Sequence, residues 1–172
     1  MHNALTPVEA YSRSPHLCIT HAGDIGALAG APIEKLYLEG MSTLEGDIGA
    51  LAGAPIQELI LDGCENLTGG IGELVGAPIQ KLYLEGCKKL TGCDIEVFKD
   101  MPIEKLDFSG CNNLTVDIGA LAGTPIQLLD LYNCENLTDD IRALAGKQIK
   151  KLDLPYCKNL TAVEGLSYSE QK

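Results

Sequence analysis

The chain has no tryptophan, and aromatic residues make up only 5% of its 172 residues. Its core must therefore be built mainly from aliphatic side chains. Basic residues are also few, because 13 Lys and Arg stand against 24 Asp and Glu, for a formal net charge of −11. A nucleic-acid binder needs a surplus of Lys and Arg to neutralise phosphates. We therefore expect no nucleic-acid partner.

Long hydrophobic runs are missing as well. No stretch approaches the ~20 apolar residues that a membrane-spanning helix needs, and the first 16 residues contain no continuous hydrophobic segment typical of a signal peptide. We expect no membrane partner. The 19 glycines follow no three-residue period, which excludes collagen.

What the chain does contain is one segment repeated six times. The copies begin at isoleucines separated by 23, 23, 24, 23 and 23 residues. These are Ile33, Ile56, Ile79, Ile103, Ile126 and Ile149. Each copy fits the pattern I-x-x-L-x-[LF]-x-x-[CM]-x-x-L, and most continue with a glycine-rich stretch such as EGDIGALAGAP. A fixed period of this length is typical of stacked repeat architectures.

The pattern predicts how each copy folds. The central L-x-L alternation is typical of a short strand with one buried face. One such unit cannot bury that face alone, so neighbours must stack and align their strands as a parallel sheet. On the return path, Asp47, Asp94, Asp117 and Asp140 suit helix N-caps, and glycine and proline then end each short helix. The predicted fold class is α/β, a curved solenoid with a parallel sheet on the concave face and short helices or turns on the convex face.

These segments resemble leucine-rich repeats. The strand segment is similar to the cysteine-containing variety of that family, and connections such as LTGGIGEL look like the LTGxIP segment of plant-type repeats. The resemblance covers residues 16–163 and implies a solenoid that binds a protein partner on its concave sheet.

The domain boundaries follow from the repeat. We expect a tail or improvised cap at 1–15, a repeat domain at 16–163, and a C-terminal tail at 164–172. The domain opens with a degenerate half repeat at 16–32, in which Cys18 stands 23 residues before Met41. Solenoid ends normally carry a polar capping unit, and the pattern fades after Thr161 without one. We therefore expect either a fragment of a longer array or ends that associate.

The cysteines mostly share one pattern position. Six of the seven occupy the ninth position, and Met41 fills the same position in the first full repeat. They are Cys18, Cys64, Cys87, Cys111, Cys134 and Cys157. Because Met replaces Cys, the position requires a small or flexible apolar group, and we expect a buried ladder of free thiols with no metal or cofactor. Cys93, at the one-residue insertion, is expected to be the exposed thiol.

Free thiols without a signal peptide favour an intracellular protein. Four N-x-T sequons, at Asn66, Asn113, Asn136 and Asn159, leave secretion and glycosylation open. Their recurrence has a structural explanation, because the turn after each strand favours Asn and Thr side chains that bond to nearby backbone.

The outward strand positions are the candidate binding site. The fifth and seventh pattern positions would place an aromatic half, bordered by acidic residues, toward the N-terminus, and three aspartates in register toward the C-terminus. The candidate residues are Tyr37, Glu39, Ile60, Asp62, Tyr83, Glu85, Asp107, Asp130, Tyr132 and Asp153. Tyrosines often anchor interfaces, and aligned carboxylates favour a cation, which could be a partner's basic group or, as a weaker alternative, a divalent ion. The competing interpretation is a solvated surface copied by duplication.

Catalytic patterns are not found in the sequence. The three histidines all lie in the N-terminal segment, and G-A-L-A-G lacks the Lys-Ser/Thr of a phosphate loop. We therefore expect a non-catalytic protein–protein interaction module that binds a basic, partly apolar surface through its concave sheet. Two alternatives stay open: the recognition or sensor part of a larger regulatory protein, and a structural array that assembles end to end.

Overall fold

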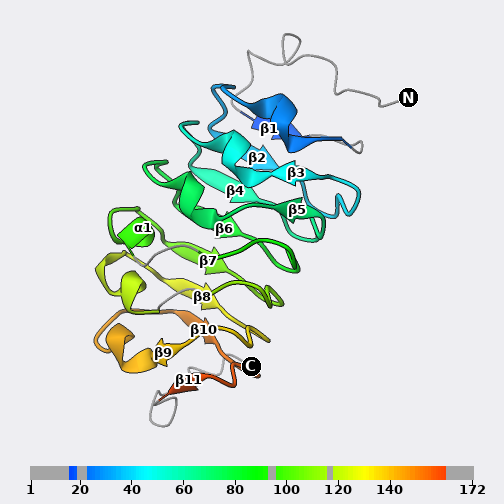
Figure 1. The fold of residues 1–172 in the computed structure, drawn as a ribbon. Coiled ribbons are helices and arrows are strands. Elements are labelled where there is room, and N and C mark those ends of the chain that lie inside the picture. The colour runs from blue at the N-terminus through cyan, green and yellow to red at the C-terminus, as the bar shows by residue number, and fades with distance from the viewer. Residues whose placement is uncertain (1–15, 19–22, 93–95, 116–117, 162–172) are drawn as a thin grey trace.

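The chain forms one parallel sheet from strands that follow each other in sequence order (Figure 1). The computed structural model describes residues 16–18, 23–92, 96–115 and 118–161. The strands are β1 (His16–Cys18), β2 (Lys35–Tyr37), β4 (Glu58–Ile60), β6 (Lys81–Tyr83), β7 (Lys105–Asp107), β8 (Leu128–Asp130) and β10 (Lys151–Asp153). The predicted α/β class and parallel sheet are confirmed, and the arrangement is consistent with a solenoid.

The strands pair one repeat apart. Leu36 lies beside Leu59, and Tyr37 beside Ile60. The extra residue of the third full repeat does not shift the sheet, because Leu82 still pairs with Leu106. The alternation of the pattern therefore places every central leucine on the same, inward side of the sheet.

Short helices carry the chain back between strands. They are the 3-10 helices η2 (Ile25–Leu28), η3 (Ile48–Leu51), η4 (Ile71–Leu74), η5 (Ile118–Gly123) and η6 (Ile141–Leu144), with α1 (Glu96–Lys99) in the third full repeat. Figure 1 shows them stacked in a second column beside the strands. Two-residue strands precede some of them: β3 (Gly46–Asp47) pairs with β5 (Leu67–Thr68), and β9 (Asp139–Asp140) pairs with β11 (Leu160–Thr161).

Aspartates cap three of these helices, and the caps at Asp47 and Asp140 confirm the sequence prediction. The carboxylate of Asp24 accepts the N–H of Gly26 at 2.7 Å, and that of Asp47 accepts the N–H of Gly49 at 2.8 Å. Asp140 caps η6 in the same way. The predicted caps Asp94 and Asp117 lie outside the described residues.

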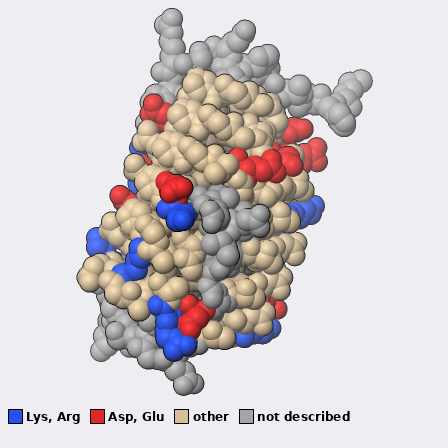
Figure 2. Space-filling model, turned by 60° about the vertical axis from the view of Figure 1, so that its left-hand side comes forward, with Lys and Arg blue, Asp and Glu red and all other residues tan. Residues whose placement is uncertain are grey.

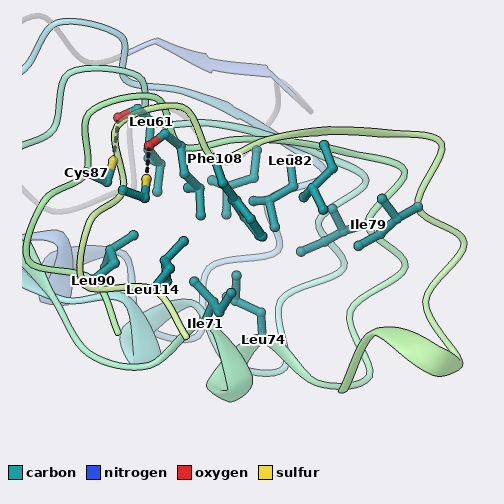
Figure 3. Packing of buried hydrophobic residues seen from close by; sticks show 14 of the residues in the cluster. Leu61, Ile71, Leu74, Ile79, Leu82, Cys87, Leu90, Phe108 and Leu114 are labelled. Carbon is teal, nitrogen blue, oxygen red and sulfur yellow. Dashed lines mark hydrogen bonds between the residues drawn. The ribbon is translucent and has the colours of Figure 1, made fainter. Parts of the chain in front are cut away.

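The interior is one hydrophobic cluster built from the apolar pattern positions (Figure 3). Leucine and isoleucine from successive repeats stack on one another, and the aromatic contribution is small. In the third and fourth full repeats, Phe98 and Phe108 are both buried, with ring centroids 6.1 Å apart. The core is therefore a column of nearest-neighbour contacts along the stack.

The predicted burial of the thiol ladder is confirmed for four described cysteines, whereas Cys157, in the last repeat, is only partly buried. Cys64, Cys87, Cys111 and Cys134 are buried and free. Each thiol donates to a carbonyl of the preceding repeat, as Cys87 does to Leu61 at 3.1 Å (Figure 3). Burial raises the pKa of Cys64 to about 11 and that of Cys111 to about 12. These thiols are thus structural donors and poor nucleophiles.

The prediction that Cys18 belongs to this ladder is wrong. Cys18 lies in β1 opposite Tyr37, whereas the 23-residue alignment places it opposite Met41. That alignment would set Arg13 against the buried Leu36, and the chain instead pairs Leu17 with Leu36. The connection to η2 is shortened as a result. Cys93 and the expected tails at 1–15 and 164–172 lie outside the described residues.

Among the described residues, every helix is too short or too polar to span a membrane.

Candidate functional site

The candidate site is the outward side of the seven-stranded sheet, which we call the sheet face. It consists of the side chains at the third, fifth and seventh pattern positions. Alternation puts them outward because the residues between them, such as Leu36 and Leu38, are buried. The inter-strand ladder continues past the strand ends, since the N–H of Leu38 binds Ile60 O at 2.9 Å. The backbone around the seventh positions therefore belongs to the same hydrogen-bonded ladder as the strands.

The fifth positions form one row across the sheet, in the predicted order. Register pairs Tyr37 with Ile60, Ile60 with Tyr83, and Tyr83 with Asp107. Asp130 follows Asp107, and Asp153 follows Asp130. The structure therefore brings these six candidate residues together in a single row.

A paired network occupies the N-terminal half of the sheet face. Glu58 accepts hydrogen bonds from Lys35 at 2.9 Å, from Tyr37 at 2.8 Å and from Lys81 at 3.1 Å. The Lys35 and Tyr37 bonds hold the pKa of the Glu58 carboxyl at about 2. The hydroxyl of Tyr37 is thus engaged within the molecule. Glu58 was not among the candidates, although the Lys-Glu-Lys order at the third position was a signal for this network.

Asp130 corrects one expectation. It was expected to be an outward binding residue, but it is only 7% exposed. Its carboxylate accepts from Lys151 at 2.8 Å and from the Ser109 hydroxyl at 2.7 Å. Burial acts to raise its pKa, and these bonds outweigh burial, so that the pKa lies below its ordinary value. The cation that the aligned aspartates favour is therefore Lys151 of the same chain.

No metal-binding cluster of three or more His, Cys, Asp or Glu is found among the described residues. The divalent-ion alternative consequently has no support from the geometry of the aspartate row.

Three carboxylates beside Ile60 and Tyr83 form no ion pair with a Lys or Arg among the described residues. Glu39 and Glu85 are exposed, and Asp62 between them is half-buried. The Asp62 carboxylate accepts the backbone N–H of Glu85 at 2.9 Å. Burial raises the pKa of Asp62 to about 6, and the charges of Asp107, Glu85 and Glu39 add to this rise. A cation bound at this part of the sheet face would reduce the repulsion between these carboxylates.

An exposed aromatic pair lies at the C-terminal end of the sheet face. Tyr132 is 46% exposed and Tyr156 is 63% exposed. Their ring centroids are 5.4 Å apart with an interplanar angle of 86°, an edge-to-face arrangement. Tyr156 was not a candidate. Its one signal in the sequence was a bulky residue at the eighth pattern position, where the first four full repeats have glycine.

The side of the molecule with the short helices has a different surface. Figure 2 shows this side covered mainly by uncharged residues, with scattered acidic and basic groups. The ion pair between Arg142 and Asp140 lies at the start of η6.

The sequon asparagines link consecutive repeats. The amide of Asn66 donates to Ser42 O at 2.7 Å, and that of Asn113 donates to Lys88 O at 2.8 Å. Asn136 and Asn159 donate to the preceding repeat in the same way. The expected bonds from these side chains to nearby backbone are present, and the carbonyls that accept them belong to the neighbouring repeat. These hydrogen bonds stabilise the stacking of consecutive repeats.

No model of a known protein family matches the chain, and a search of curated proteins finds no match either. The side chains of the sheet face are therefore the basis for assigning a function.

Proposed function

We propose that the chain is a leucine-rich-repeat solenoid that binds a basic, partly apolar protein surface on its concave sheet, without catalysing a reaction. One observation carries the proposal: acidic charge without a basic partner, placed beside apolar side chains. Among the described residues, no ion pair joins Glu39, Asp62 or Glu85 to a Lys or Arg. Other carboxylates of the same surface, Glu58 and Asp130, are paired.

The physical reason is electrostatic complementarity. A net charge of −11 attracts a basic partner from a distance and speeds its encounter. On contact, Lys or Arg side chains would relieve the repulsion around Asp62, while Ile60 and Tyr83 would supply apolar contact area. The free, buried thiols support an intracellular location, since disulfides are rare there.

Site-specific crosslinking tests the proposal. A photoreactive amino acid placed at Tyr83, on the sheet face, should capture a basic protein from a lysate of source cells. The matched position is Val75, which is 60% exposed and follows η4 on the helical side. A partner captured from Val75 and not from Tyr83 would move the binding surface to that side.

Charge reversal gives a second, independent readout. Glu39→Lys with Glu85→Lys should abolish capture at Tyr83. The control is Glu45→Lys with Asp100→Lys, which changes the net charge equally at exposed positions outside the sheet face. If both double variants lost capture equally, net charge alone would explain the loss, and the proposal of a specific binding surface would be contradicted.

A further inference from the structure

The edge-to-face pair of Tyr132 and Tyr156 is unusual in this molecule because aromatic rings are few and these two are exposed. Exposed aromatic faces carry negative electrostatic potential and attract cations. Phe98 and Phe108, the other described aromatic pair, are buried in the core. The tyrosine pair therefore does not serve the packing of the interior in the same way.

The backbone at Tyr156 adds a second observation. The eighth pattern position has a positive φ in every full repeat, with values of 71° at Gly40 and 76° at Gly63. Tyr156 has φ 66°, a conformation that costs a bulky side chain free energy and that glycine adopts readily. Strain of this kind often marks a functional position. Here it places a ring next to Tyr132.

A carboxylate lies on the same surface. The inter-strand ladder runs on from β8 and β10, since the N–H of Leu131 binds Asp153 O and that of Asn133 binds Pro155 O, both at 2.8 Å. Asp153 pairs with Asp130, so Tyr132, two residues beyond Asp130, is its diagonal neighbour on this face. Among the described residues no ion pair involves Asp153, because Lys151 binds Asp130 at 2.8 Å.

We infer that Tyr132, Tyr156 and Asp153 form a site for the guanidinium group of an arginine on the bound protein. The inference rests on the proposed function and names the side chain that one end of the sheet face would take. A guanidinium plane stacks on an aromatic ring and presents paired N–H donors to a carboxylate, which a lysine ammonium does not match. An acidic group would be repelled by the Asp153 carboxylate. A purely apolar group would remove water from this carboxylate and offer no hydrogen bond in return.

The test uses the full chain and a short peptide, N-acetylated Gly-Arg-Gly-Arg-Gly amide. The control peptide has citrulline in place of arginine, which keeps the shape and removes the charge. Incorporated 3-fluorotyrosine gives one fluorine signal for each of the six tyrosines. Substitution of Tyr132 or Tyr156 by Phe assigns the two relevant signals. The arginine peptide should shift both, and the citrulline peptide should shift neither.

Two variants test which side chains contribute to the affinity for the arginine peptide. Tyr156→Gly should keep the fold, because glycine occupies this position at Gly40, Gly63, Gly86 and Gly110. Tyr156→Gly and Asp153→Asn should each weaken peptide binding by about fivefold or more, the size expected for a lost cation–π or charged contact. Glu45→Gln removes one charge at an exposed position outside the sheet face and should change the affinity by less than about twofold.

Three results would overturn the inference: equal binding of the citrulline peptide, no shift of the two tyrosine signals, or a loss in Glu45→Gln as large as in Asp153→Asn. The outcome is separable from that of the proposed function. A partner crosslinked from Tyr83 with no arginine peptide bound at Tyr132 and Tyr156 contradicts the inference alone. An arginine peptide bound there with no partner captured at Tyr83 contradicts the proposed function alone.

Discussion

At the scale of single residues, carboxylates of the sheet face respond to pH in opposite directions. Glu58 is held by Lys35 and Tyr37 with a pKa of about 2, below its ordinary 4.5. Its stabilising contribution is present above pH 4.5 and is lost as the pH falls toward 2. Asp62 has a pKa of about 6, above its ordinary 3.8, mainly because it is buried. Between pH 3.8 and 6 the folded chain holds this proton more tightly, so stability falls as the pH rises through that window.

We therefore predict that Asp62→Asn stabilises the protein at pH 7 by about 1 kcal/mol, a value reduced from the full pKa shift because the side chain is partly exposed. The asparagine oxygen still accepts the Glu85 N–H, so the change removes only the charge. At pH 3.5, where Asp62 is mostly protonated in both states, the two proteins should be nearly equal. Urea unfolding at the two pH values measures the difference, and an equal gain at both would contradict the electrostatic cause.

The sequence was sufficient to predict which side chains share the sheet face, because a strict period of two and a fixed repeat decide this. It was not sufficient to predict how those side chains pair. Asp130 and Asp107 have the same pattern position, yet Asp130 is buried because the next repeat supplies Lys151 and the previous one supplies Ser109. Tyr156 was missed for a similar reason: its contact with Tyr132 depends on a left-handed backbone.

At the scale of elements, aspartate side chains cap the 3-10 helices η2, η3 and η6 at their first turn. Asp47 caps η3, and the residue above it in the next repeat, Gly69, has no side chain to collide with the capping carboxylate. Gly46 lies above the cap Asp24 in the same manner. In these two pairs the capping aspartate occupies space that only a glycine of the next repeat leaves open. The sequence predicted the cap at Asp47 but not its contact with a glycine 22 residues later, because that contact depends on how the repeats stack.

The helix η4 has Gly70 as its N-cap residue, and glycine has no side chain that could bind the N–H groups of the first turn. We predict that Gly70→Asp raises the free energy of unfolding by a few tenths of a kcal/mol, by supplying the bond to Gly72 N–H that Asp47 makes to Gly49. Gly70 has an ordinary φ of −95°, and an added Cβ would lie 3.5 Å from Gly92 O, a normal contact. Thermal unfolding followed by circular dichroism measures the change.

The matched control is Gly69→Asp, one residue earlier. Gly69 has φ 96°, and an added Cβ would collide with the Asp47 carboxylate. This variant should melt at a lower temperature than the parent. A lower melting temperature for Gly70→Asp as well would show that the first turn of η4 does not accept the cap.

At the scale of the whole molecule, the contacts that hold the repeats together join nearest neighbours. Thiols of the ladder donate to the preceding repeat, as Cys111 does to Leu84 O, and so do the sequon asparagines. The ion pairs Lys88–Glu65 and Lys158–Glu135 each span 23 residues. The sum of such contacts stabilises a stack approximately as a one-dimensional array, in which a repeat at the end has one neighbour and a central repeat has two.

This arrangement predicts that the same substitution costs different amounts along the chain. Leu106 is fully buried between Leu82 and Leu129, whereas Leu152, in the edge strand β10, pairs with Leu129 on one side and is only partly buried. We expect Leu106→Ala to cost about 3–4 kcal/mol and Leu152→Ala about 1–2 kcal/mol, because a site enclosed on both sides leaves a larger cavity. Urea unfolding gives both values, and hydrogen exchange should show weaker protection of Leu152 and its neighbours than of Leu106. Equal costs would contradict a nearest-neighbour stack and would require a contact that encloses the C-terminal strand as fully as the central strands enclose each other.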